Sequence, residues 1–171
     1  MMKAVVDIET DGLDATKIHC IVAKHYQTGE TRQWVGDECA QFGGWSGKID
    51  QFIMHNGISF DGPILNRLAN AKIRPDQIRD TLIESQLYNP VRDGGHSLQS
   101  WGERLNYTKG DFNEFEEYSP EMLQYCIRDT ELTRKLGVNL EKEGKSFEPQ
   151  AYELERQIRS IIDRQQDNGF A

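Results

Sequence analysis

The sequence predicts an α/β domain built on a mixed β-sheet. Apolar segments before residue 60 have the β-branched character of strands, whereas later ones recur mainly at helical spacing. Strands that come first and then alternate with helices are typical of a sheet with both antiparallel and parallel pairs. At 171 residues the chain fits one domain, which is long enough to bury a core without disulfide bonds.

The first predicted strand begins at Lys3 and ends in acidic residues. Asp7 and Glu9 lie within its apolar run, and side chains two positions apart on a strand point to the same face. Two such carboxylates repel each other and lose hydration, unless a cation or several hydrogen-bond donors lie between them. A divalent metal ion is one explanation. The other is an acidic turn at the end of the strand, for which Asp11-Gly12 is well suited.

Two more strands are expected to extend the first one into three consecutive antiparallel strands. They occupy Lys17–Tyr26 and Thr31–Val35, with a hairpin turn at Gln27–Glu30 between them. Residues 37–47 predict one short helix followed by a Gly-rich loop. Strand character then returns at Ile49–Asn56.

The remainder of the chain is predicted to be mostly helical. One helix is expected at Pro63–Ala71, with Asp61 as its N-cap. Arg79–Ile83 is expected to close a strand and open a helix, so that Asp80 is either a strand-end or a helix-start residue. Residues 106–118 have no period and predict a mobile surface segment. Further helices are expected at Ser97–Leu105, from Ser119-Pro120 to about Glu143 with Gly137 as a candidate interruption, and from Pro149 to near Asn168-Gly169.

Composition and charge limit the classes of function. The formal charge of -8 and the pI of about 5.0 argue against a protein that holds nucleic acid through a broad basic surface. They allow an enzyme that touches only a few terminal nucleotides. Cys20, Cys39 and Cys126 lack paired metal-ligand spacing, so we expect free thiols and no zinc site. Because no apolar run reaches membrane-spanning length and no signal peptide is evident, we expect a soluble cytoplasmic protein.

Two later acidic residues have ordinary structural explanations when each is taken alone. Asp61 suits a helix N-cap, and Asp129 suits a surface ion pair. Together with Asp7 and Glu9, however, they form a set of hard oxygen ligands without clustered His or Cys, which favours Mg²⁺ or Mn²⁺. Two such ions about 4 Å apart are the usual clamp for in-line phosphoryl displacement. Tyr125 shares a helix face with Asp129, from which its hydroxyl could hold the attacking water.

Three stretches of the sequence resemble the motifs of the DEDD exonuclease superfamily. The tyrosine four residues before the last aspartate indicates the tyrosine subclass, because the histidine subclass has His where this chain has Gln124. The resemblance is strongest to the proofreading domain of family A DNA polymerases of short-tailed, T-odd-like bacteriophages, and spans about Ala4 to Thr133. The three motifs are Asp7-Ile8-Glu9-Thr10, His55-Asn56-Gly57-Ile58-Ser59-Phe60-Asp61 and Tyr125-Cys126-Ile127-Arg128-Asp129, and Arg79–Leu82 and Gly95–Leu105 match further landmarks.

The resemblance implies a ribonuclease-H-like (DnaQ-like) fold, with a mixed five-stranded sheet flanked by helices. It also implies that two divalent cations, Mg²⁺ or Mn²⁺, bind to the carboxylates of these motifs. Asp7, Glu9 and Asp129 would surround the metal on the nucleophile side. Asp7 would bridge to the second ion, and Asp61 would reach that ion through water.

The resemblance further implies roles around the substrate. Tyr125 would orient the attacking water. Thr10 would lie near the primer 3′ end, and Leu13 would wedge against the terminal base, the alternative for Leu13 being a plain core leucine. We leave His55 and His96, together with the neighbouring Asn56, outside the catalytic set. A histidine beside a turn is more often a hydrogen-bonded structural group, and the tyrosine subclass needs no histidine base.

The function implied is a 3′–5′ DNA exonuclease that releases nucleoside 5′-monophosphates, as in proofreading, with a preference for single-stranded or frayed ends. Opening a paired terminus costs a few kcal/mol, which favours an unpaired one. Its setting would be the infected bacterial cell. Two alternatives stay open: an RNA-directed 3′–5′ exonuclease of the same superfamily, and a non-catalytic module that binds a polymerase.

The C-terminal part departs from the polymerases that the chain resembles. We expect residues 1–146 to form the exonuclease domain. Residues 147–171 would form the helix that leads, in the family, into a polymerase domain that is absent here. The chain is accordingly expected to be a domain of a parent polypeptide, or a separately encoded exonuclease that uses this helix to bind a DNA polymerase partner.

Overall fold

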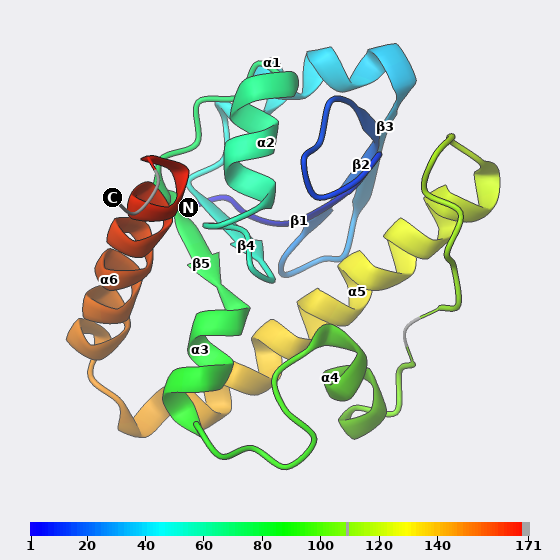
Figure 1. Ribbon diagram of the computed structural model, residues 1–171. Helices are drawn as coiled ribbons and strands as arrows, with labels where there is room; N and C mark the ends of the chain where they lie inside the picture. The colour runs from blue at the N-terminus through cyan, green and yellow to red at the C-terminus, as the bar shows by residue number, and fades with distance from the viewer. Residues whose placement is uncertain (109, 169–171) are drawn as a thin grey trace.

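A five-stranded mixed sheet forms the centre of the computed structural model, which describes residues 1–108 and 110–168 (Figure 1). The strand order is β3-β2-β1-β4-β5; β1, β2 and β3 pair antiparallel, whereas β4 pairs parallel with β1 and with β5. The predicted fold class is therefore confirmed. The strands are β1 (Lys3–Thr10), β2 (Ile18–His25), β3 (Thr31–Val35), β4 (Gln51–Met54) and β5 (Ile78–Asp80).

Helices cover both faces of the sheet. The shorter helices α1 and α2 pack on one face, and the long helix α5 crosses the other (Figure 1). None of the described helices is both long enough and apolar enough to cross a membrane. The helices are α1 (Phe42–Ser46), α2 (Asp61–Leu68), α3 (Thr81–Tyr88), α4 (Leu98–Arg104), α5 (Pro120–Glu143) and α6 (Pro149–Asn168).

The central strand β1 divides its side chains between the two faces of the sheet. Ala4, Val6 and Ile8 are buried in the core cluster that includes α2. Because side chains alternate along a strand, Asp7 and Glu9 lie on the opposite face, which α5 crosses. The strand register thus places both carboxylates between the sheet and α5.

Helix α2 begins at Asp61, and Asp61 is not its N-cap. That position belongs to Phe60, whose side chain makes no capping hydrogen bond. The preceding turn supplies backbone acceptors instead, because the Gly62 N–H donates to Gly57 O at 2.7 Å and the Ile64 N–H donates to Phe60 O at 3.2 Å. The predicted role of Asp61 as the N-cap of α2 is therefore wrong.

The Gly-rich stretch predicted as a loop is helical. Residues 36–41 form a 3₁₀ turn, and α1 continues through Gly43 and Gly44. The Gly43 N–H donates to Ala69 O at 2.9 Å, and a Cβ at this position would lie 2.0 Å from Asn70 O. Glycine is needed here because two chain segments touch through their backbones, which local composition does not reveal.

Helix α5 is continuous through Gly137, the candidate interruption. A Cβ on Gly137 would lie 3.2 Å from Cε1 of Tyr26, so this glycine allows a close approach of the Tyr26 ring. The start of α5 is as predicted, because the Ser119 hydroxyl accepts a hydrogen bond from the Met122 N–H at 3.2 Å. The last helix, α6, is described as far as Asn168, and the Gly169 of its predicted end lies outside the described residues.

Exchanging the two neighbouring glycines of α1 for alanine gives a matched test of this packing. We expect Gly43→Ala to lower the free energy of unfolding by about 2 kcal/mol or more, because the new methyl group displaces the Asn70 backbone. Gly44→Ala meets no atom within 4 Å and should stabilise the protein by about 0.5 kcal/mol. Urea unfolding of both variants measures the difference, and equal stabilities would contradict the packing role of Gly43.

Candidate active site

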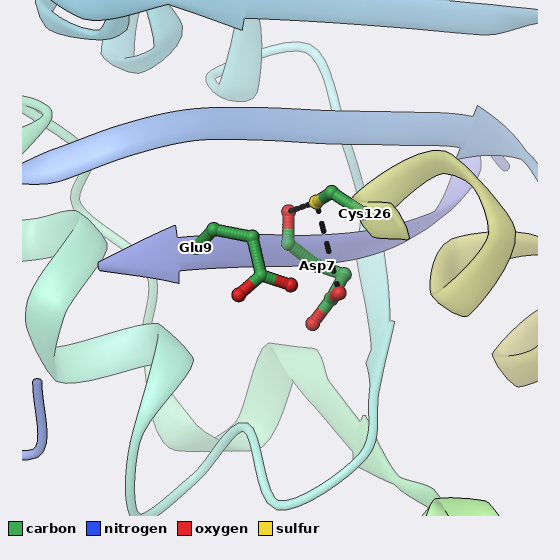
Figure 2. A group of neighbouring side chains, drawn as sticks. All are labelled: Asp7, Glu9 and Cys126. Atoms are coloured by element: carbon green, nitrogen blue, oxygen red, sulfur yellow. Dashed lines mark hydrogen bonds between the residues drawn. The ribbon is translucent and has the colours of Figure 1, made fainter. Parts of the chain in front are cut away.

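Asp7 and Glu9 project from the same side of β1 toward a common region (Figure 2). Asp7 is half-buried and Glu9 is buried. The part of β1 that carries them pairs with β2, from Asp7 opposite Val22 to Glu9 opposite Cys20, whereas β4 pairs only with Lys3–Val5. The pairing with β2 limits how far the two carboxylates can move apart to relieve their repulsion.

A cavity of about 450 Å³ opens in front of these two side chains. Three segments that are far apart in the sequence supply its acidic lining: Asp7 and Glu9 from β1, Asp61 from α2, and Asp129 from α5. Tyr125, one turn before Asp129, lines the same cavity. All five residues predicted to act in catalysis therefore lie together. The rest of the lining is formed by Ile8, His55, Asn56, Phe60, Leu82, Ser97, Leu98 and Phe115.

The charge of this cavity is unbalanced. Neither lysine nor arginine is among the described residues that line it. Burial raises the pKa of Asp61 well above its usual value, and the nearby carboxylates of Asp7 and Asp80 raise it further. An all-oxygen donor set with excess negative charge fits a hard divalent cation such as Mg²⁺ or Mn²⁺.

Cys126 is a neighbour of Asp7 that the sequence did not single out. Its Sγ lies 3.6 Å from the backbone oxygen of Asp7 and 3.7 Å from Asp7 Oδ2 (Figure 2). The ligand atoms of Asp7, Glu9 and Cys126 all lie within 4.8 Å of one another. Burial raises the pKa of the Cys126 thiol well above its usual value. The Cys126 Sγ is placed to act as a weak hydrogen-bond donor to Asp7.

Asp80 organises the turn that precedes Asp61. Its buried carboxylate accepts hydrogen bonds from the Asn56 N–H at 2.9 Å, the Ile58 N–H at 3.2 Å and the Leu82 N–H at 3.0 Å. The last of these bonds makes Asp80 the N-cap of α3. Asp80 therefore has both of the roles that the sequence left open, because it ends β5 and caps the start of α3. Asp80 does not itself line the cavity.

The two histidines near the cavity are engaged in structural hydrogen bonds. His55 Nδ1 lies 2.8 Å from Thr81 Oγ1, and its Nε2 lies 3.0 Å from His96 O. His96 Nδ1 lies 2.7 Å from Ser85 Oγ. These contacts join the end of β4 to α3 and to the loop before α4. They agree with the exclusion of both histidines from the catalytic set.

The two predicted substrate contacts, Thr10 and Leu13, do not line the cavity. The Thr10 hydroxyl is buried and donates to Gly12 O at 2.9 Å, so it shapes the turn after β1. Leu13 is 89% exposed, which rules out the alternative of a core leucine. Asp11 closes the same loop by accepting the Thr16 N–H at 2.9 Å, and its hydrogen bonds to Thr16 and Lys17 lower its pKa to about 2.

A larger groove of about 810 Å³ lies elsewhere, between α6 and residues 58–76. Its acidic residues are engaged locally, because Asp76 pairs with Arg74 at 3.0 Å and Asp163 accepts a hydrogen bond from Ser59 at 2.8 Å. It lacks the convergence of carboxylates seen at β1. The smaller cavity is therefore the better candidate for hydrolytic chemistry.

The chain is similar in sequence to two phage DNA polymerases. No protein-family model matches the chain. The DNA-directed DNA polymerases of Escherichia phage T7 and Enterobacteria phage T3 are each 24% identical, in alignments that cover 97% of this chain and 33% of the relative. The chain thus spans about a third of the length of these curated relatives.

Solved structures share the fold. Brucella melitensis NrnC with bound Mg²⁺ superimposes with a TM-score of 0.70 at 19% identity, over 95% of this chain and 85% of NrnC. Phi29 DNA polymerase complexed with single-stranded DNA gives a TM-score of 0.57 at 15% identity, over 84% of this chain and 32% of the polymerase. The predicted resemblance to phage DNA polymerases and the predicted ribonuclease-H-like fold are confirmed.

Removing one carboxylate should relieve the repulsion in the metal-free protein. We expect Asp61→Asn to raise the free energy of unfolding by about 1 kcal/mol at pH 8, since a pKa raised on folding penalises the charged form. This penalty is absent below the unfolded-state pKa of Asp61, grows as the pH rises, and is complete above the raised folded-state pKa. The gain should therefore shrink as the pH falls.

Urea unfolding in a chelator across this pH range tests the expectation. Asp37→Asn, on the exposed 3₁₀ turn, serves as the matched control and should change little. An Asp61→Asn protein that is less stable than the wild type at pH 8 would contradict the charge imbalance.

Proposed function

We propose that the chain is a metal-dependent 3′–5′ exonuclease that removes nucleotides from DNA 3′ ends and releases nucleoside 5′-monophosphates. The observation that carries this proposal is the convergence of four carboxylates and Tyr125, from three separate elements, on one cavity. Support comes also from the two similar proteins that are DNA polymerases.

The proposed metal ligands are Asp7, Glu9, Asp61 and Asp129. Two Mg²⁺ or Mn²⁺ ions held by these residues would activate water and stabilise charge on the leaving oxygen. Asp7, Glu9 and Asp129 would hold the metal that activates the attacking water. Asp61, held on the first turn of α2, would serve the other ion. The pairing of β1 with β2 would keep Asp7 and Glu9 in place throughout the reaction.

Tyr125 would orient the attacking water through its hydroxyl. It lies one helical turn from Asp129, so both side chains reach the cavity from the same face of α5. A histidine base is not required in this arrangement, and both ring nitrogens of His55 are within hydrogen-bond distance of Thr81 and His96. The tyrosine would act by holding the water through its hydroxyl and not by taking its proton.

Substrate selection would depend on the shape of the DNA end. A 450 Å³ cavity receives a terminal nucleotide only after it has left its partner base, so frayed and single-stranded ends would be favoured. We propose that the exposed Leu13 packs against the terminal base, while Thr10 shapes the turn that presents it. Contacts to phosphate and sugar would give little sequence preference.

RNA is the second candidate substrate. Brucella melitensis NrnC, whose fold this chain shares, has been solved bound to pGG, so a short oligonucleotide is a plausible alternative to a DNA end. DNA is proposed first because the curated relatives are DNA polymerases. Only contacts near the 2′-hydroxyl separate the two substrate classes.

The first test is nucleotide release from matched single-stranded DNA and RNA oligonucleotides labelled at the 3′ end. We expect mononucleotide release from DNA in Mg²⁺ or Mn²⁺, abolished by a chelator and by Asp7→Ala, because this substitution removes a proposed metal ligand. Asp37→Ala is the matched control and should remain active. Faster release from RNA would transfer the proposal to RNA, and an inactive wild type would favour the non-catalytic module.

The second test separates water positioning from metal binding. Tyr125→Phe should lower kcat by about 10²-fold, as expected for loss of a group that orients the reacting water. Binding of Mn²⁺, measured by calorimetry, should be unchanged because the four carboxylates remain. Turnover at the wild-type rate would remove Tyr125 from the mechanism.

A DNA polymerase is the proposed partner or parent of this domain, and α6 is the proposed contact. One side of α6 packs on the domain: the Tyr152 ring lies against the core cluster, the Tyr152 hydroxyl accepts the Asp80 N–H at 2.7 Å, and Asp163 accepts the Ser59 hydroxyl at 2.8 Å. Its apolar residues face outward, which marks an interaction site. The domain boundary near residue 146 fits this division. The exposed stripe consists of Leu154 (58%), Ile158 (42%), Ile161 (47%) and Ile162 (40%).

The partner that covers this stripe is taken to be a DNA polymerase, because about two thirds of the length of each phage polymerase lies outside the part that matches this chain. The probe is therefore the part of the T7 polymerase outside the match, titrated with this chain. Binding should weaken at least about tenfold in a Leu154→Ser/Ile161→Ser variant, whose fold and nuclease activity should be unaffected. Equal binding of wild type and variant would remove α6 as the contact.

A further inference from the structure

Two phenylalanines from one irregular segment enclose the ring of Tyr125. The Phe112 and Tyr125 ring centroids are 5.7 Å apart with an interplanar angle of 39°, and those of Phe115 and Tyr125 are 6.1 Å apart at 70°. Phe112 and Phe115 contact each other edge to face at 5.2 Å. Gly110 completes the enclosure, because a Cβ at that position would lie 3.4 Å from Cδ2 of Tyr125.

The segment that carries these residues, 110–118, is tied to the sheet. His19 on β2 is 2% exposed, and its Nε2 lies 2.7 Å from Phe115 O. Phe112 and Phe115 also pack against the buried cluster formed by β2 and α5. The prediction of an irregular segment is confirmed for its described residues, but these contacts contradict a loop that is free at the surface.

Tyr125 needs such support because of where it lies. It is half-buried and lies close to the N-terminus of α5, at the wall of the cavity. A tyrosine on a helix surface can exchange rotamers, and each exchange would carry its hydroxyl several ångströms away from the cavity. A misplacement of about 1 Å is enough to cost about 10²-fold in rate when a reacting group must be held in line.

We propose that Phe112 and Phe115 are positioning residues that hold the Tyr125 ring in the orientation from which its hydroxyl reaches the attacking water. The proposal rests on the function proposed above and extends it to a segment outside the three motifs. Ring contacts of this geometry are favourable and directional, so they select one ring orientation and not merely a buried one.

Phe112 separates positioning from direct contact with the substrate. Phe115 lines the cavity and can touch a bound nucleotide, whereas Phe112 is not among the described residues that line it. An effect of Phe112 on catalysis must therefore pass through its neighbours. Its ring neighbours Tyr125 and Phe115 both reach the cavity, and the Tyr125→Phe background separates these two routes, which makes Phe112→Leu the sharper substitution.

The test is a double-mutant cycle between Phe112→Leu and Tyr125→Phe. In the wild-type background, Phe112→Leu should lower kcat about tenfold and leave KM unchanged, because the hydroxyl is less well oriented. In the Tyr125→Phe background it should change kcat less than about twofold, because there is no hydroxyl left to orient. An equal loss in both backgrounds, or no loss in either, would overturn the proposal.

Three controls keep the cycle interpretable. Phe147→Leu removes a ring that packs on Tyr88, with centroids 4.9 Å apart, far from the cavity lining, and should not alter kcat. Phe112→Tyr keeps the aromatic ring and should have the kcat of the wild type. If Phe112→Leu does not fold, the same cycle is run with Phe112→Met, which retains more of the volume, and the same outcomes decide.

A measurement without substrate distinguishes failure of this proposal from failure of the proposed function. In the metal-free protein, ring resonances of Tyr125 observed by NMR should show a faster ring flip in Phe112→Leu than in wild type or Phe147→Leu. An unchanged flip rate would contradict the positioning of the Tyr125 ring by Phe112, even if the protein is an active nuclease. A faster flip in a protein without nuclease activity would support this positioning and contradict its catalytic role.

Discussion

Electrostatic repulsion between Asp7 and Glu9 is the constraint on which the site depends. Both carboxylates stand on one face of the central strand, where pairing with β2 holds the backbone that carries them. Most proteins would place lysine or arginine opposite such a pair. This chain brings two more carboxylates, Asp61 and Asp129, to the same cavity. Placing four carboxylates together costs free energy without a cation and is favourable when a cation is bound.

A second buried carboxylate, Asp80, gives this site its rigid border. Through three backbone N–H groups it joins the end of β5, the turn that follows β4 and the start of α3. One of these groups belongs to Asn56, which has a φ of 65°, a conformation that asparagine tolerates better than most residues. The turn leads directly into Asp61. A residue outside the cavity therefore determines where one of its carboxylates lies.

The same turn is connected to α6, one side of which packs on the domain. Tyr152 meets the backbone of Asp80, and Asp163 meets Ser59 two residues before Asp61. The hydrogen bonds of α6 thus end at the border of the site, while its apolar stripe is exposed to solvent. This orientation is the reverse of that expected for an amphipathic helix covering a domain by itself. Whatever covers the stripe will lie close to the elements that hold Asp61.

The sequence by itself determined most of the strands and helices, the mixed sheet with its first three strands antiparallel, and the five residues that meet in the cavity. Periodicity and turn chemistry are local properties, and the spacing of Asp7 and Glu9 on a strand places them on one face without further information. Only the tertiary structure decided which contacts are made across the sequence. It gave Asp61 a place in the cavity and not a cap, explained Gly43 and Gly137 by close approach of distant segments, and brought Cys126 beside Asp7. It also showed Phe112 and Phe115 packed around Tyr125. These features depend on which segments the fold places side by side, and no pattern within one segment carries that information.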